Sequence, residues 1–416
     1  MRKRQGEKLQ ERGAISRRVV VAGAAVTAFG APIPMLGRYA ASLAPAARAE
    51  EVALQAIGKT GLTLLSDRPL NLETPPHLLD DRVTPAGRLF VRNNGLPPEA
   101  ARLDPATWRL DIDGEVDTPL SLTIPELQDR FETVDLQLPL ECAGNGRKFF
   151  EPSASGNQWT FGGIGCPRWT GVRLRDVLEA ARPKKTCVYT GHYGADMHLS
   201  GNPDKAPISR GVPIAKAMEP NTLIAFAMNG EPMPLLNGHP LRLIVPGWPG
   251  SCSQKWLTRI TLRDRMHDGP KMMGKAYRMP KTPALPGGAI GDEEMEVIST
   301  LPLKSLVTFP ETGAAVAAGA AFEVRGHAWA GEDNVAGVDI STDFGATWRA
   351  AELAPQANPF AWRHWRAEVE APTPGYYEVW ARARDTDGGG QPPVPPGWNP
   401  KGYLNNMQHR IAVMAS

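Results

Sequence analysis

The chain has 416 residues, of which 42% are hydrophobic and 22% charged, and its formal net charge is +2. This length allows roughly two or three domains with sizeable cores, and the composition is that of a globular protein. Residues 1–49 contain nine Lys and Arg but only two acidic residues, so the remainder of the chain is net acidic. That balance, without a sustained basic stripe, argues against nucleic-acid binding.

The first 49 residues have the pattern of an export signal. Arg17 and Arg18 precede an apolar run of small residues, and Ala47 and Ala49 fit a small-x-small cleavage site. A membrane anchor is the alternative, but the run is short and two prolines interrupt its end. We therefore expect residues 1–49 to be a twin-arginine signal that directs a folded protein to the periplasm, and we expect no membrane span after it.

The next segments predict an arm followed by a mixed domain. Residues 50–85 are interrupted by prolines and predict an N-terminal arm, and residues 86–285 alternate between strand and helix patterns. Thr123 and Glu126 form a capping-box pattern at the start of a helix. Strands are expected at 88–98, 107–116, 134–142, 186–191, 239–247 and 255–262, and short helices at 124–131, 173–181 and 213–218.

The C-terminal part differs from the preceding domain in its composition and sequence pattern. Proline and glycine are frequent between 278 and 315, and we expect a linker at 286–300. Residues 301–416 hold six of the eleven tryptophans and several short alternating segments separated by turn residues. This spacing predicts a β-sandwich of immunoglobulin type.

The stretch LECAGNGRKF at 140–149 raises the question of what a thiol does at the end of a strand. None of the four cysteines forms a CxxC or CxxCH pair, which excludes a zinc ribbon and covalently attached haem. Cys142 could be a packed structural cysteine, a nucleophile or a ligand. The spacing of the cysteines leaves open whether an exported form contains a disulfide.

LECAGNGRKF resembles the cysteine loop of the sulfite oxidase family of molybdenum enzymes. The resemblance extends to Arg92-Asn93, to residues 159–174 and 238–256, and to GHAWAG and VDISTDFGATW in the last domain. It implies an α+β protein, with a mixed α/β molybdopterin domain followed by an immunoglobulin-like domain that forms a homodimer. It also implies a molybdenum–molybdopterin cofactor, with no haem on this chain.

The resemblance implies roles for particular residues. Cys142 would be the thiolate ligand to molybdenum, a soft ligand for a metal with redox chemistry. The implied catalytic residues, which would bind an anionic substrate and wall its pocket, are Arg92, Arg147, Lys401, Tyr277 and Trp159. Arg168 and Lys148 are further candidate cations. The implied cofactor-binding residues are Phe90, Val91, Arg92, Asn93, Asn94, Asp196, Asn237, Arg242, Ser253, Gln254 and Lys255.

The chain departs from the family pattern at two of the cofactor-binding positions. Asn237 stands where the family has a histidine, and either Asn237 or His239 could supply that contact. The expected aspartate is Asp196 or is replaced by Tyr193.

Two further departures bear on the substrate. Asn94 replaces a histidine and Lys401 an arginine of the sulfite-oxidising members, which favours resemblance to the molybdenum subunit of Sox-type sulfane dehydrogenases. That branch implies carrier-bound sulfane sulfur as substrate, in thiosulfate oxidation, and a c-type, dihaem cytochrome as acceptor. The nearest alternative is a periplasmic sulfite dehydrogenase. A methionine sulfoxide reductase and a non-catalytic binding protein fit less well, because of the added sandwich and the intact Cys142.

Overall fold

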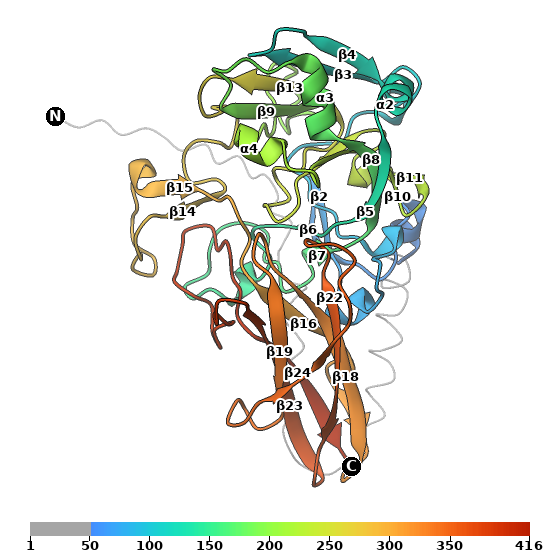
Figure 1. The fold of residues 1–416 in the computed structure, drawn as a ribbon. Helices are drawn as coiled ribbons and strands as arrows, with labels where there is room; N and C mark the ends of the chain where they lie inside the picture. The colour runs from blue at the N-terminus through green and yellow to red at the C-terminus, as the bar shows by residue number, and fades with distance from the viewer. Residues whose placement is uncertain (1–50) are drawn as a thin grey trace, which may run out of the picture. The chain divides into compact units, whose positions relative to one another are not determined.

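The computed structural model describes residues 51–416, so the predicted export signal lies outside the described part of the chain. A mixed α/β part, coloured blue to yellow in Figure 1, precedes a part built from strands, coloured orange to red. Within residues 51–416, no helix combines the length and the apolar character that crossing a bilayer requires.

The predicted arm contains a hairpin that lies next to candidate cofactor residues. β1 (Thr63–Asp67) and β2 (Leu70–Glu73) pair antiparallel, and η1 (Pro76–Leu79) and η2 (Ala86–Arg88) follow. The prediction of a strand at 88–98 is wrong, because this segment forms only isolated bridges at Val91 and Leu96. The backbone N–H of Asn93 instead donates to the Asn71 side chain, at 2.7 Å, so it is not available to a strand ladder.

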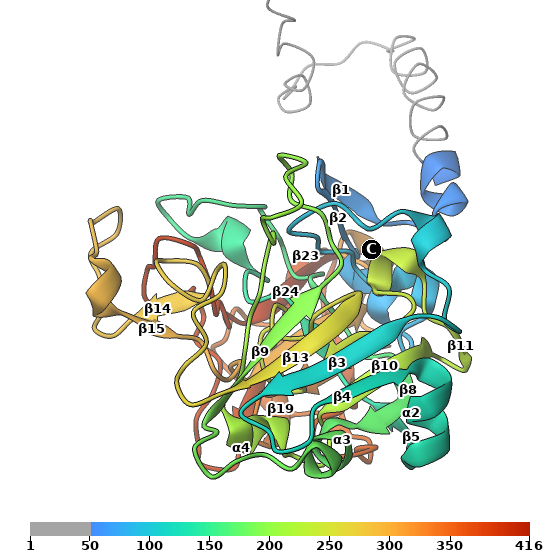
Figure 2. The same cartoon turned by 90° about the horizontal axis from the view of Figure 1, so that it is seen from above.

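Two sheets build the mixed α/β part (Figure 2). The first has the order β11 (Glu231–Pro232), β10 (Leu223–Met228), β8 (Arg168–Arg173) and β5 (Thr133–Gln137), and β12 (Arg242–Ile244) also pairs with β10. The second has the order β4 (Leu120–Thr123), β3 (Arg109–Gly114), β13 (Leu257–Arg263) and β9 (Tyr189–Gly194). β3 and β13 are parallel, and the other neighbours in this sheet are antiparallel.

Three short helices accompany these sheets. The predicted capping box at the start of α2 (Ile124–Arg130) is confirmed, since the Thr123 side chain accepts from the Glu126 N–H and the Glu126 carboxylate accepts from the Thr123 N–H. α3 (Leu174–Ala181) buries one apolar face, which holds it against the core. α4 (Ile214–Ala217) is a single turn, and η3 (Ala100–Arg102) and η5 (Leu235–Asn237) are shorter connections.

The strand predicted over 134–142 is interrupted before the cysteine. β5 ends at Gln137, and β6 (Leu140–Glu141) pairs separately with β7 (Ile164–Gly165). Pro139 lies in the gap and has no N–H to donate to a ladder, which accounts for the break. Cys142 therefore follows a two-residue strand, and the chain turns through Gly146, at φ 93°, into η4 (Arg147–Phe149).

The predicted linker is not devoid of secondary structure. β14 (Arg278–Pro280) and β15 (Met295–Val297) pair antiparallel, and η6 (Asp292–Glu294) lies between them. The expected linker at 286–300 therefore contains η6 and β15, and pairing with β14 orders β15.

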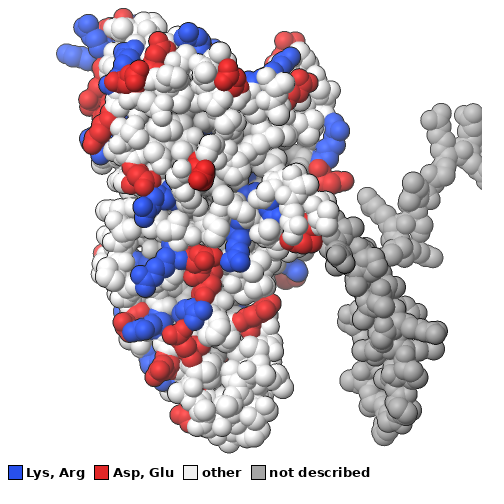
Figure 3. Space-filling model, turned by 90° about the vertical axis from the view of Figure 1, so that its right-hand side faces the viewer, with Lys and Arg blue, Asp and Glu red and all other residues white. Residues whose placement is uncertain are grey.

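The predicted C-terminal sandwich is confirmed. One sheet has the order β16 (Lys304–Phe309), β18 (Ala321–Trp329), β22 (Arg363–Glu370) and β21 (Glu352–Leu353). The other has the order β17 (Ala314–Val316), β24 (His409–Ala415), β23 (Gly375–Asp385), β19 (Val335–Ser341) and β20 (Arg349–Ala350). Val324, Trp365 and Val379 are among the inward-facing residues of its core. On the face in Figure 3, acidic and basic side chains are interspersed.

Candidate active site

A cavity beside Cys142 gathers residues from distant parts of the mixed α/β part. Its walls come from the segment after β2, from the cysteine loop, from the segment 236–256 and from the loop before β14. The predicted site residues that line it are Phe90, Arg92, Asn94, Cys142, Asp196, Asn237, Arg242, Ser253, Gln254, Lys255 and Tyr277. The structure thus brings together most of the residues implied by the sequence.

Cys142 has the placement of a ligand. It is 6% exposed and is the cysteine that faces this cavity. Its backbone N–H donates to the Gly163 carbonyl at 2.8 Å, which fixes the start of the loop. All four cysteines lie in the described part, and all are buried and free. By contrast, burial raises the pKa of Cys166 to about 12, as expected of an inert structural thiol.

Donors converge on one oxygen at the cavity wall near Cys142. The Asn94 amide oxygen accepts from Arg92 Nη2 at 3.0 Å, from Lys271 Nζ at 2.6 Å and from the Tyr277 hydroxyl at 3.3 Å. Burial acts to lower the pKa of Arg92, but neighbouring Tyr277 and Cys142 raise it, and the pKa lies above its usual value. The Arg92 guanidinium therefore carries its positive charge beside the Cys142 thiol.

A second group of cations lies around Arg242. Burial lowers the pKa of Arg242 to about 9, and burial together with Arg242 lowers the pKa of Lys59 to about 7. Burial and Arg242 also lower the pKa of Lys255 well below its usual value, with Asp196 opposing them. Within residues 51–416, none of these three cations makes an ion pair with a carboxylate. Buried positive charge without a partner is costly, so the cavity favours an anionic ligand.

Buried polar atoms without hydrogen-bond partners also indicate that the cavity binds a ligand. Arg242 Nε, Ser251 Oγ and Gln254 Oε1 are buried without a hydrogen-bond partner among the described residues, and all three residues line the cavity. Such atoms require partners from a ligand or water. A polar ring system carrying a phosphate, as in molybdopterin, would satisfy both the donors and the acceptor, so the residues present fit the implied cofactor.

The cavity also indicates how a metal would be held. Within residues 51–416, no group of three or more His, Cys, Asp or Glu side chains gathers at one point. A metal at Cys142 would therefore need most of its ligands from outside the protein, which the dithiolene of the cofactor would supply. Cys142 would contribute the protein's thiolate.

In each of the two open alternatives, one residue of the two lines the cavity. Asp196 lines the cavity, and burial raises its pKa to about 6. Tyr193 instead packs under the Arg259 guanidinium, 4.2 Å from the ring centre. Asn237 lines the cavity while His239 does not. Lys59 Nζ donates to the Asn237 amide oxygen at 2.7 Å, and Arg242 Nη1 donates to the Asn237 carbonyl at 2.7 Å.

Three of the predicted catalytic residues, Arg147, Lys401 and Trp159, do not line the cavity. Arg147 is buried, and its guanidinium donates to the carbonyls of Lys401, at 2.5 Å, and Asn157, at 2.7 Å. Lys401 Nζ donates to Ser155 Oγ at 2.9 Å. Trp159 is fully buried and packs edge-on against Phe90, which itself lines the cavity.

The remaining predicted positions have simpler surroundings. Val91 is buried under the hairpin, and the Asn93 side chain accepts from Lys255 Nζ. Arg168 and Lys148 are exposed, and Arg168 pairs with Asp135 at 3.4 Å, so neither reaches the cavity.

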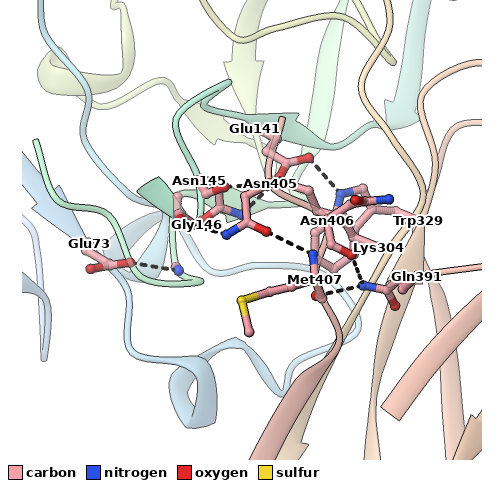
Figure 4. A network of polar contacts seen from close by, with 12 residues as sticks. Glu73, Glu141, Asn145, Gly146, Lys304, Trp329, Gln391, Asn405, Asn406 and Met407 are labelled. Carbon is pink, nitrogen blue, oxygen red and sulfur yellow. Dashed lines mark hydrogen bonds and ion pairs between the residues drawn. The ribbon is translucent and has the colours of Figure 1, made fainter. Parts of the chain in front are cut away.

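The cysteine loop is tied to the sandwich by a buried polar network (Figure 4). The Glu141 carboxylate pairs with Lys304 Nζ at 2.5 Å and accepts from Trp329 Nε1 at 2.8 Å. Asn405 Nδ2 donates to the Gly146 carbonyl at 2.7 Å. Strands of the C-terminal part therefore help to build the loop that carries Cys142.

Sequence reasoning missed several residues around the cavity. Lys59 and Arg210 are fully buried, Tyr403 stacks on Tyr277 with ring centres 5.5 Å apart, and Lys271 reaches Asn94. Burial, with Tyr277 nearby, raises the pKa of Tyr403 to about 12. No local pattern marks Lys59 or Arg210. The nearness of Lys271 to Tyr277 in PKMMGKAY was a usable signal.

Comparisons with known proteins agree with this geometry. The model of the oxidoreductase molybdopterin binding domain matches residues 96–271, and the model of the Mo-co oxidoreductase dimerisation domain matches residues 295–416. Sulfite oxidase of Gallus gallus is 34% identical over 361 residues, covering 84% of this chain and 77% of that protein. Mitochondrial sulfite oxidase of Mus musculus is 32% identical over 385 residues, covering 89% of this chain and 69% of that protein.

A solved structure is similar along nearly its whole length. The structure of the sulfane dehydrogenase SoxCD from Paracoccus pantotrophus matches with a TM-score of 0.69 and 26% identity. The match covers 93% of this chain and 92% of that chain.

Proposed function

This chain belongs to the sulfite oxidase family of molybdenum oxidoreductases and acts on sulfur compounds, and from that premise we propose that it is a periplasmic sulfane dehydrogenase. Its substrate is sulfane sulfur bound to a cysteine of a carrier protein during thiosulfate oxidation. The observation that carries this proposal is the match to the SoxCD chain over 93% of this chain and 92% of that one.

The residues of the cavity have distinct parts in this function. The molybdenum cofactor, when bound, supplies two-electron redox chemistry and oxygen transfer. Cys142 would hold the metal, and Arg242 and Gln254 would hold the organic part of the cofactor through Arg242 Nε and Gln254 Oε1, which have no partner among the described residues. Lys255 would add a cation at the same wall of the cavity. Arg92 and Tyr277 lie at the thiol end and bind oxygen atoms on sulfur, since a guanidinium and a hydroxyl both donate to such oxygens.

Electrons must leave through a partner. The 416 residues contain no CxxCH pair for covalent haem. We propose a c-type, dihaem cytochrome subunit as acceptor, supported by the similarity to SoxCD. Export through the twin-arginine pattern of residues 1–49 would bring the folded, cofactor-loaded protein to such a partner in the periplasm, and the dimerisation domain supports a homodimer.

Sulfite dehydrogenase is the second candidate. It is favoured by the 34% identity to the sulfite oxidase of Gallus gallus. The two candidates differ in whether a carrier protein is required.

Reduction of cytochrome c by the purified holoenzyme separates these candidates. We expect faster reduction with a carrier protein loaded with sulfane sulfur than with sulfite at equal concentration, and none with the unloaded carrier. Equal or faster reduction with sulfite alone would favour sulfite dehydrogenase. A molybdenum-loaded protein that reduces cytochrome with neither substrate would contradict both functions.

A further inference from the structure

The Asn94 amide oxygen occupies an unusual position at the cavity wall. Arg92, Lys271 and Tyr277 all donate to it, at 3.0, 2.6 and 3.3 Å. Two of the three donors belong to cations, and the acceptor is a neutral amide. A full negative charge on the acceptor adds Coulomb attraction to both cations, which a neutral amide lacks. An anionic oxygen at this point would therefore bind these donors more strongly than the amide does.

No ion pair with a described residue neutralises the charge at this point, although Asp196 is near enough to favour the charged form of Lys271 and so to oppose the lowering of its pKa by burial. Within residues 51–416, neither Arg92 nor Lys271 makes an ion pair with a carboxylate. Asn94 lines the cavity with Arg92 and Tyr277, so an anion that enters beside Cys142 reaches the same donors. Partly buried cations in this state favour an incoming anion, because it supplies the missing counter-charge.

The loop that carries Lys271 is held in a costly conformation. Lys271 and Tyr277 have φ angles of 70° and 53°, in the left-handed region that residues other than glycine seldom adopt. Arg210 fixes this loop, because its Nη1 donates to the Lys271 carbonyl at 2.9 Å and its guanidinium lies 5.1 Å from the centre of the Tyr277 ring. The two side chains are thus aimed at Asn94 by contacts outside their own loop.

We propose that Lys271 is a specificity-determining residue that binds an oxygen of a sulfur oxyanion together with Arg92 and Tyr277. The oxyanion displaces the Asn94 amide oxygen from these donors. A neutral side chain at position 94 is then essential, because a carboxylate would hold both cations and exclude the anion. This inference rests on the proposed function, and it extends that function by adding a binding residue outside the family motifs.

Sulfate binding to the oxidised holoenzyme tests the proposal without turnover. Titration calorimetry is carried out on variants whose molybdenum content is measured in parallel. We expect Lys271→Met to raise the Kd for sulfate by about tenfold or more, the effect of losing one hydrogen bond to a charged group. Asn94→Asp, which keeps the size of the side chain, should raise the Kd at least as much, and Lys271→Arg should largely retain binding.

Lys275→Met is the matched control. Lys275 lies in the same loop and makes no hydrogen bond or ion pair with a described residue, so its loss should leave sulfate binding unchanged. If Lys271→Met or Asn94→Asp binds sulfate as the parent protein does, the proposal is wrong. Should Lys271→Met fail to fold, the isosteric Asn94→Asp variant decides alone. Sulfate binding that depends on Lys271, without turnover of sulfane or sulfite, would contradict the proposed function but not this inference.

Discussion

Lys59 shows how one residue from the arm can shape the cofactor end of the cavity. Its ammonium is fully buried and donates to the carbonyls of Ala86 and Leu89, at 2.7 and 2.9 Å, as well as to the Asn237 amide oxygen. The Asn237 carbonyl in turn accepts from Arg242. Lys59 therefore positions a cavity residue and, through it, a cation that would contact the cofactor.

Replacing Lys59 tests this positioning role. Lys59→Met leaves three oxygen atoms, two of them in buried hydrogen bonds, without their donor, so we expect the free energy of unfolding to fall by about 2–4 kcal/mol. Molybdenum per chain should fall as well, because Arg242 loses its support. Urea unfolding and metal analysis measure the two effects. Lys185→Met, at an exposed position, is the control, and equal stability and metal content in both variants would contradict this role.

At the scale of elements, the short strand β6 is joined to β16 of the sandwich by Glu141 and Lys304. The side chains of Glu141 and Lys304 are 1% and 7% exposed, and Glu141 immediately precedes Cys142 in the chain (Figure 4). The carboxylate also accepts from Trp329 and from Asn145 Nδ2, at 2.8 and 2.9 Å. The Glu141 carboxylate therefore has a cationic partner and two further hydrogen-bond donors within the protein.

A double-mutant cycle tests whether this pair acts as a unit. Lys304→Met leaves a buried carboxylate without its cation, and we expect a loss of about 3–5 kcal/mol in the free energy of unfolding. Adding Glu141→Gln should recover part of that loss, because the remaining amide is neutral. Equilibrium unfolding of the two single variants and the double variant provides the measurement. Strictly additive losses would show that the two residues are energetically independent.

Several of the strands that local patterns predicted correctly alternate in burial along the chain. β3 lies within a segment where a strand was expected and β13 overlaps another, and each of them buries one face. The segments 88–98 and 134–142 were predicted as strands but are interrupted, since an Asn71 side chain and Pro139 intervene. An alternating hydrophobic pattern indicates that one face of a segment is buried. It does not indicate whether a neighbouring strand is present to form hydrogen bonds with that segment.

The candidate site likewise contains some residues that the sequence predicted and others that it did not. Most of the predicted positions that belong to a sequence motif, such as Cys142 and Arg242, lie together around one cavity, whereas Arg147 and Trp159 do not line it. Lys59 and Lys271 reach that cavity through contacts across 178 and 177 residues of sequence. No spacing rule within one segment can anticipate the contact of Lys59, because it depends on how separate elements pack, whereas Lys271 is marked only by its nearness to Tyr277 in the sequence.

At the scale of the whole described molecule, the C-terminal sandwich has a structural role in addition to dimerisation. Lys304 and Asn405 contact the loop around Cys142, and the Lys401 carbonyl accepts from Arg147. The loop that would hold the metal is therefore built jointly by the two parts of residues 51–416. Substitutions in the sandwich that break these contacts should affect the metal site as well as the dimer.

The central claim is that Cys142 is the protein's ligand to molybdenum, and X-ray absorption at the molybdenum edge tests it most directly. The purified protein should contain about one molybdenum per chain, as expected for a single thiolate site. Cys142→Ser should lose the metal or a sulfur from its coordination shell, whereas Cys187→Ser, which does not line the cavity, should keep both. An unchanged sulfur shell in Cys142→Ser, or a folded parent protein without molybdenum, would contradict the account.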